Sequence, residues 1–411
     1  MEGRKIHPYT LALLSLIVGC NHGEVPPYPS YAPPVQTYQP VASSENGFDT
    51  YALVAKELET LDRKSVSRVA FHPQQRKNAL ASVAPLLPKI RAATQKPFSF
   101  KFVPRTPFGA APYQSSWRLI GRAMAWQVED AVAAGQWDTA IDGVVTATRF
   151  GFDLTGGAAT EGSLGFSIVD DVRRAIAPSL DKLSVVQLHR LTEGLKLALR
   201  RKPHLSLALE HERMIALSGL QSIQDDYREG QFKDLDRNLG PDGSDAVTYL
   251  KSLTPSDRKR VTYFDSFHSY IEAESAYAAA IAPLPASERT KIPAPIIPKN
   301  SAWHRIAKYL TRGSLVLIEM NDATVARTRL LVIESELTRQ RKLKMTMPAN
   351  LSGFSGTLAT DPYSGHKFGY RHMDTEYQVY SVGPNLTDDD GQTDADYANP
   401  DLVLEKPAGT N

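Results

Sequence analysis

A helical hydrophobic period dominates most of this chain and limits the folds that are open to it. From Phe48 to about Lys344, apolar residues recur at the three- and four-residue spacing of a buried helix face. The clearest stripes lie at 117–131, 141–148, 164–176 and 185–199. Each stripe must be buried against another element, so the sequence predicts a mainly α protein with several packed helices.

Local signals mark some of the helix ends. Ser184 and Gln187 are spaced as a capping box at the start of the fourth stripe. Thr254 followed by Pro255 predicts an N-cap with proline in the first turn of a later helix. Pro283 then ends that helix, because proline cannot continue the hydrogen-bond ladder.

One connection resembles the turn of a tetratricopeptide-type helical hairpin. It is the segment 135–140, Gly-Gln-Trp-Asp-Thr-Ala, in which glycine permits the reversal and alanine lets two helices approach closely. Only one such hairpin matches, and a repeat array normally contains several units. A multi-helix bundle and an irregular α-solenoid therefore both remain open.

The first twenty residues have the features of an export signal. Arg4 and Lys5 precede an apolar run at 9–18, which is shorter than the roughly 20 residues of a membrane-spanning helix. The following Gly19-Cys20 completes a segment, Ile17 to Cys20, that resembles the lipobox of bacterial lipoproteins. The resemblance implies that 1–20 is a lipoprotein signal peptide and that Cys20 carries the lipid. It also implies a cell-envelope, extracytoplasmic protein that is anchored to a bacterial membrane.

A proline-rich segment follows at 21–47. It contains six prolines and three tyrosines with little aliphatic content, so it cannot bury enough apolar surface to fold. We expect a disordered, polyproline-like tether that could hold the folded body up to roughly 80 Å from the membrane. Cys20 is the sole cysteine of the chain, which excludes a disulfide framework and any zinc site built on several thiolates.

The rest of the chain divides at a second proline-rich segment, 292–298. We expect a helical body at 48–298 and a long helix that begins near Lys299. Residues 299–344 contain ten Lys and Arg against four Asp and Glu, which we interpret as a solvated charged face. The net charge of the whole chain is only +2, so no nucleic-acid partner is expected.

The hydrophobic period changes from helical to alternating after Pro348. Two short runs, 367–372 and 377–382, predict an antiparallel β-hairpin. Asp361-Pro362, the spacing of Gly365 and Tyr370, and the segment 377–385 resemble the C-terminal end of type II secretion major pseudopilins. The resemblance implies that 299–384 forms a long helix followed by a small β-hairpin module.

An acidic segment, 385–411, closes the chain, and we expect it to form a flexible tail. Six aspartates lie within 388–401, a stretch without Lys or Arg, so they either stay apart in water or gather around a cation. The pseudopilin resemblance implies calcium ligation by Ser381, Asn385 and one or both of Asp394 and Asp396. Asn385 stands where that family usually has Asp, which removes one charge from the site.

Known catalytic motifs are missing, which favours a protein without catalytic activity but leaves an enzyme open as an alternative. There is no Gly-rich phosphate loop, HExxH or GxSxG segment, and 162–165 is the nearest approach to a nucleophile elbow. His204 and His211 are spaced to share a helix face with Glu210 and Glu212 close by, but we interpret them as a solvated pair without metal. Apart from calcium, no cofactor is expected.

These observations favour a binding or scaffold lipoprotein whose helical body offers a groove to a protein or peptide partner. One alternative is an envelope enzyme whose catalytic groups are assembled only by the fold. Another is an accessory of a pilus-like or secretion apparatus, which the C-terminal resemblance alone suggests. For the binding or scaffold lipoprotein, we expect the contact with the membrane to be made through the lipid at Cys20.

Overall fold

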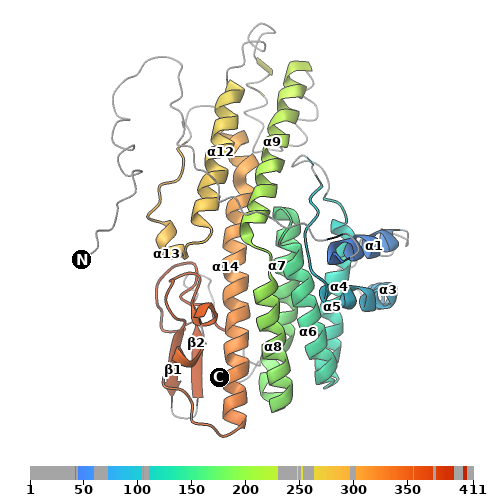
Figure 1. The fold of residues 1–411 in the computed structure, drawn as a ribbon, viewed down its shortest axis with the longest axis vertical. Helices are drawn as coiled ribbons and strands as arrows, with labels where there is room; N and C mark the ends of the chain where they lie inside the picture. Colours follow the sequence, from blue (N-terminus) through green and yellow to red (C-terminus); the bar gives the residue numbers. More distant parts are fainter. Residues whose placement is uncertain are drawn as a thin grey trace, which may run out of the picture.

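The computed structural model describes residues 42, 45–59, 73–103, 105, 111–229, 248, 251–252, 263–296, 302–354, 356–373, 376–392 and 401–404. The fold is mainly α (Figure 1). The α-helices are α1 (Gly47–Glu59), α3 (Pro73–Val83), α4 (Leu87–Thr94), α5 (Gln114–Ala133), α6 (Trp137–Leu154), α7 (Ala159–Ile176), α8 (Val185–Arg201), α9 (Leu205–Glu229), α12 (Tyr263–Ile281), α13 (Ala286–Arg289) and α14 (Ala302–Lys342). Short 3-10 helices are η2 (Ala84–Leu86), η3 (Ala177–Lys182), η4 (Leu351–Gly353) and η5 (Gly356–Ala359). The predicted signal peptide with Cys20 and the predicted Thr254-Pro255 cap lie outside the described residues.

The long helix α14 organises the molecule. It runs along the middle of Figure 1 and contacts α7, α8, α9 and α12, which come from distant parts of the chain. A solenoid would instead restrict each helix pair to its sequence neighbours. The architecture is therefore a helix bundle, and the predicted mainly α fold is confirmed.

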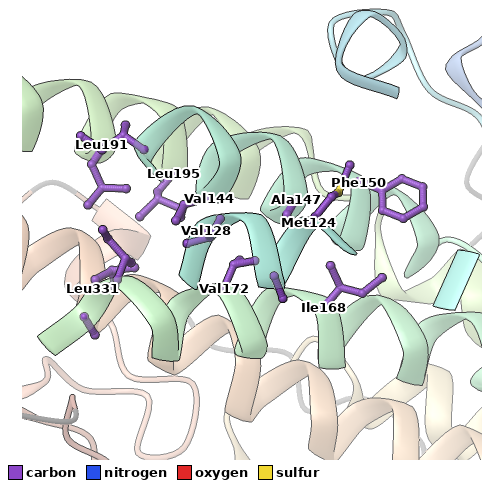
Figure 2. Packing of buried hydrophobic residues seen from close by; sticks show 14 of the residues in the cluster. Met124, Val128, Val144, Ala147, Phe150, Ile168, Val172, Leu191, Leu195 and Leu331 are labelled. Carbon is purple, nitrogen blue, oxygen red and sulfur yellow. The ribbon is translucent and has the colours of Figure 1, made fainter. Parts of the chain in front are cut away.

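The predicted apolar stripes form the core of this bundle. Met124 and Val128 of α5, Val144 of α6, and Ile168 and Val172 of α7 are all buried where the three helices meet (Figure 2). Figure 2 also shows side chains from α8 and α14 in the same cluster, Leu191, Leu195 and Leu331. Burial of these stripes is the main source of stability for the helices.

Two glycines bring α6 and α7 unusually close together. A Cβ atom at Gly165 would lie 2.2 Å from the carbonyl oxygen of Gly151, and a Cβ at Gly151 would lie 2.6 Å from the carbonyl oxygen of Gly165. Neither position can take a side chain without moving a backbone. The segment 162–165 is thus part of a helix interface, and it does not form a nucleophile elbow.

The predicted local signals are confirmed where the structure describes them. Helices α5 and α6 form an antiparallel hairpin whose turn places Gly135 at φ +66°, a conformation that glycine adopts without strain. The Ser184 side chain accepts a hydrogen bond from the Gln187 backbone N–H, and the Gln187 side chain accepts one from Ser184, as in a complete capping box.

The predicted C-terminal hairpin is also confirmed. Strands β1 (Gly369–Met373) and β2 (Glu376–Tyr380) pair antiparallel, with Tyr370 opposite Val379. The hairpin lies beside the last turns of α14 (Figure 1), where the hydroxyls of Tyr377 and Thr338 are 2.9 Å apart. Together with the described residues before and after it, in 351–354, 356–368, 381–392 and 401–404, it forms the C-terminal module, which is attached to the side of the bundle.

The end of this module corrects the prediction of a flexible tail from residue 385 onward. Leu402 forms a β-bridge with Ser381 through two backbone hydrogen bonds of 2.8 and 2.9 Å. Asp401 is buried and accepts a hydrogen bond of 2.6 Å from the Gly391 backbone. The prediction gave weight to the aspartates, but the apolar Leu402 and Leu404 return this part of the segment to the core.

The predicted body and module share one hydrophobic core. The cluster that contains the α5–α8 stripes also contains Phe368, Val379 and Leu404 of the module. At the other end, Asn46 is buried and exchanges hydrogen bonds with the backbone of Ser99, at 2.8 and 3.0 Å. The last residues of the predicted tether are therefore anchored to the body.

Candidate binding site

A cavity lies where the helical body meets the C-terminal module. Its volume is about 810 Å³, which is within the usual range for small-molecule sites. Four segments line it: the end of α8 with the start of α9, the loop from α12 into α13, the middle of α14, and residues 357–365 of the module. Because these segments are distant in sequence, the cavity exists only in the assembled fold.

The module is fixed to the rim of this cavity by backbone hydrogen bonds. The Ala286 N–H donates to the carbonyl oxygen of Pro362 at 3.0 Å, and the Ser287 N–H donates to that of Tyr363 at 2.9 Å. The Ser287 hydroxyl adds a bond of 3.0 Å to the Ser364 carbonyl oxygen. These contacts hold one wall of the cavity in place against α13.

Basic side chains outnumber acidic ones around the cavity. Five lysines and arginines line it, namely Lys196, Arg200, Lys202, Arg289 and Arg329. Three carboxylates also line it, namely Glu193, Asp322 and Asp361. Helices α8 and α14 each contribute residues of both signs, so the pairing of these residues decides the net field inside the cavity.

Each of the three carboxylates already has partners. Glu193 pairs with Lys196 at 2.8 Å, and Asp322 pairs with Arg289. Asp361 accepts hydrogen bonds inside the module, including 2.8 Å from the Ser381 hydroxyl. The carboxylates are thus held by groups other than the remaining three cations.

The remaining three cations make no ion pair with a carboxylate in the part of the chain that the structure describes. Lys202 Nζ donates to the Pro203 carbonyl oxygen at 3.2 Å, and Arg329 Nη1 donates to that of Thr360 at 2.7 Å. Lys202 and Arg329 are both half-buried, whereas Arg200 is exposed at the rim. The cavity therefore carries an excess of positive charge, and Asp322 and Asp361 act on Lys202 and Arg329 without a direct ion pair.

The pKa values of these groups report the same imbalance. The pKa of Lys202 is lowered to about 8, first by burial and then by the positive charge of Arg329, against the opposing effect of Asp322. Burial also lowers the pKa of Arg329, against the opposing charges of Asp361 and Asp322. The pKa of His204 is lowered first by burial and then by the charge of Lys202. An anion in the cavity would relieve this mutual repulsion.

Part of the cavity lining is apolar. The loop between α12 and α13 contributes a run of small and apolar residues, 282–285, and Leu358 and Pro362 come from the module. A ligand that places an anionic group against Lys202 could therefore bury an uncharged part against this wall.

The predicted calcium ligands are only partly described. Ser381 is fully buried, and its hydroxyl donates to Asp361 and accepts from the Gly383 backbone at 3.2 Å. Asn385 donates to Asp389 at 2.9 Å and accepts from the Thr387 backbone at 3.0 Å. Asp394 and Asp396 lie outside the described residues, so calcium binding stays a prediction.

Nearby, Asp401 has an incompletely satisfied carboxylate. Its Oδ1 atom is buried without a hydrogen-bond partner. Burial raises the pKa of Asp401, and the charges of Asp388 and Asp389 raise it as well. Within the described residues, no group of three or more His, Cys, Asp or Glu side chains is arranged to hold a metal ion.

The two histidines of the sequence analysis do not form a pair. His204 precedes α9, and its Nδ1 accepts a hydrogen bond of 3.3 Å from the Ser206 backbone. His211 is buried and stacks on Phe102 with 4.4 Å between ring centroids. The expectation of a solvated pair is therefore wrong for His211, because it packs toward the core.

His211 lies near a group of buried polar contacts at the start of α7, and its own Nδ1 atom is buried without a hydrogen-bond partner. Arg105 pairs with Glu161 at 2.8 Å, and Glu212 accepts a hydrogen bond of 2.6 Å from the Ala159 backbone. Burial lowers the pKa of His211 to about 4. Because these groups connect a loop, α7 and α9 to one another, we interpret the contacts as structural.

The sequence contained weak signals for the cavity. Arg329 lies directly before the apolar run Leu330 to Ile333, so its backbone had to lie near the core. The interpretation of 299–344 as a solvated charged face is thus wrong for Arg329. Lys202-Pro203 marks the break between two helices, where a basic side chain can turn inward.

Comparisons with family models, with curated proteins and with solved structures found no match to this chain. Among the described helices, none is long and apolar enough to span a membrane.

Proposed function

We propose that this protein is an exported lipoprotein of the bacterial envelope that binds a ligand or peptide segment in the cavity between its helical body and its C-terminal module. The cavity carries this proposal, because four separate segments create a space of about 810 Å³ and leave unpaired cations facing it. The lipobox-like segment ending at Cys20 supports the location. The lipid would anchor the protein while the segment after it separates the body from the membrane.

A binding role fits this site better than catalysis. A catalytic site needs a nucleophile, acid or base whose geometry is set by a neighbouring group. Here the three carboxylates of the cavity are held by other partners, and the unpaired groups are cations. Such an arrangement attracts and orients an anion, which is the chemistry of recognition.

The test is native mass spectrometry of full-length protein purified in detergent from its own envelope. Thr357 is an exposed residue of the cavity lining, so Thr357→Trp should obstruct the cavity without disturbing the core. Ser352→Trp is the matched control, because Ser352 is exposed on the same module and does not line the cavity.

We expect a bound mass on the wild type and on Ser352→Trp that is lost in Thr357→Trp. A wild-type protein that carries no bound mass, or a bound mass that Thr357→Trp retains, would contradict the proposed site.

A further inference from the structure

The unpaired cations of the cavity indicate what kind of group a ligand must offer. Lys202 and Arg329 come from different helical segments, and the described atoms that accept hydrogen bonds from them are neutral carbonyl oxygens. Asp322 favours the charged form of both cations and Asp361 that of Arg329, but burial outweighs these carboxylates and lowers both pKa values, so the compensation is incomplete. Two such cations in one cavity favour a ligand with concentrated negative charge.

The shapes of the lysine and arginine side chains indicate further which anionic group the cavity would bind. Lysine provides a compact charge with three donors, and arginine provides a planar fork that can hold two oxygens at once. Arg329 uses one N–H for Thr360 and keeps the others available in the cavity. Arg200 and His204 line the same cavity and add donors. A dianion with several oxygens satisfies this set better than a single carboxylate does.

We propose that the cavity binds its ligand through a dianionic phosphate group held between Lys202 and Arg329. This inference rests on the proposed function and names the ligand class of the same site. The remainder of the ligand would lie against the apolar wall formed by 282–285 and Leu358. The proposal concerns a small phosphate-bearing molecule, because the cavity volume matches such a ligand.

Replacement of Lys202 distinguishes a role in phosphate binding from a role in stabilising the fold. Lys202→Met removes a half-buried cation that Arg329 repels, so the free protein should not lose thermal stability, while phosphate binding should weaken at least ~10-fold. If Lys202 stabilised the fold instead, Lys202→Met would lower the thermal stability and leave the phosphate affinity unchanged. Arg329→Met should also weaken binding, although it breaks the bond to Thr360 as well.

Proton uptake provides an independent measure of the contact. Arg329 and Asp322 are the charged groups that act on the pKa of Lys202. The other charged or titratable residues that line the cavity are Glu193, Lys196, Arg200, His204, Arg289 and Asp361. Lys202, with its lowered pKa, is partly neutral in the free protein at about pH 8.5, and a bound phosphate should restore its proton. Titrations in two buffers of different ionisation enthalpy should therefore detect proton uptake in the wild type and none in Lys202→Met.

The deciding experiment is calorimetric titration of the detergent-solubilised full-length protein with inorganic phosphate, and separately with acetate. Arg118→Met is the matched control, because Arg118 is an exposed arginine in a smaller cavity of about 310 Å³ between α5 and α7. We expect saturable phosphate binding, acetate at least ~10-fold weaker, and wild-type affinity in Arg118→Met.

No saturable phosphate binding, acetate as tight as phosphate, or unchanged affinity in Lys202→Met would each overturn the proposal. The native mass experiment distinguishes the two proposals. If any of these results is found while Thr357→Trp still removes a bound mass from the native protein, the phosphate proposal fails and the proposed binding function stands.

Discussion

At the scale of single residues, the interior of the bundle contains charges whose burial is only partly compensated. Tyr51 donates a hydrogen bond of 2.8 Å to Asp153, and Arg149 pairs with the same carboxylate at 2.9 Å. Even so, burial raises the pKa of Asp153 to about 7, against the opposing effect of Arg149. Desolvation thus outweighs the ion pair at this position.

This balance predicts how stability depends on pH. The folded protein keeps a proton on Asp153 that the unfolded chain loses near pH 4, so the associated stability is lost as pH rises from about 4 to about 7. Asp153→Asn cannot lose this proton. Its free energy of unfolding should therefore improve relative to wild type across that range, by at least ~1.4 kcal/mol, the equivalent of one pKa unit.

Urea unfolding at several pH values measures the difference. Asp138→Asn is the control, because Asp138 lies on the same helix with an exposed carboxylate that pairs with Arg190 at 2.5 Å. A constant difference between Asp153→Asn and wild type at all pH values would contradict the account of this residue.

At the scale of elements, helix contacts are set by small residues as much as by apolar stripes. The Gly151–Gly165 contact lets α6 and α7 approach until backbone touches backbone. Gly165→Ala should force the helices apart and lower the free energy of unfolding by about 1–3 kcal/mol. Gly353→Ala is the control, because a Cβ there would meet no atom within 4 Å. Equal unfolding midpoints for the two variants would show that the close approach is not required.

The C-terminal module gives a second prediction at this scale, for the calcium site. Asn385→Asp would place a carboxylate against Asp389, so the free protein should lose thermal stability by like-charge repulsion. Calcium should reverse the loss and bind more tightly than to wild type, because each added carboxylate strengthens such sites.

Calorimetry and thermal unfolding at millimolar calcium test this prediction. Asn350→Asp, which makes the same change at an exposed residue that caps η4, should not respond to calcium. An absence of heat and of any thermal shift in both wild type and Asn385→Asp would exclude the site.

At the scale of elements, the sequence predicted those features that depend on residues close together in the chain. The Ser184 capping box, the Gly135 turn and the 367–382 hairpin each depend on residues within one short window, and each is present in the structure. The cavity was missed because its walls come from four windows that look ordinary one at a time. Lys202 and Arg329 are far apart in the sequence, and they line one cavity only after α14 has packed against the end of α8.

At the scale of the whole molecule, the bundle and the module behave as one folded unit with a cavity at their junction. Their shared core and the bonds from 286–287 to the module leave little freedom between them. The predicted acidic tail contributes to this unit through Leu402 and Leu404. Ligand binding at the junction would therefore stabilise both parts together.

The predicted lipid anchor at Cys20 also concerns the whole molecule, because it would decide where the protein is located. If Cys20 receives lipid, Cys20→Ser should release the protein to the soluble fraction or leave it unprocessed, because firm membrane attachment needs more than one acyl chain or an added signal. Fractionation and intact-mass measurement decide between these outcomes. A Cys20→Ser protein that stays with membranes and is trimmed like wild type would contradict the lipobox interpretation.

The role of the cavity is tested most directly by chemical labelling of Lys202 in the full-length protein with an amine-reactive reagent at about pH 8. A lysine whose pKa is lowered to about 8 reacts readily there, and a phosphate group held against it should block the reaction. We predict that inorganic phosphate protects Lys202, read by peptide mass spectrometry, while the exposed Lys89 is labelled equally with and without phosphate. Labelling of Lys202 that is unaffected by phosphate, or protection that Lys89 shares, would contradict an anion site at this junction.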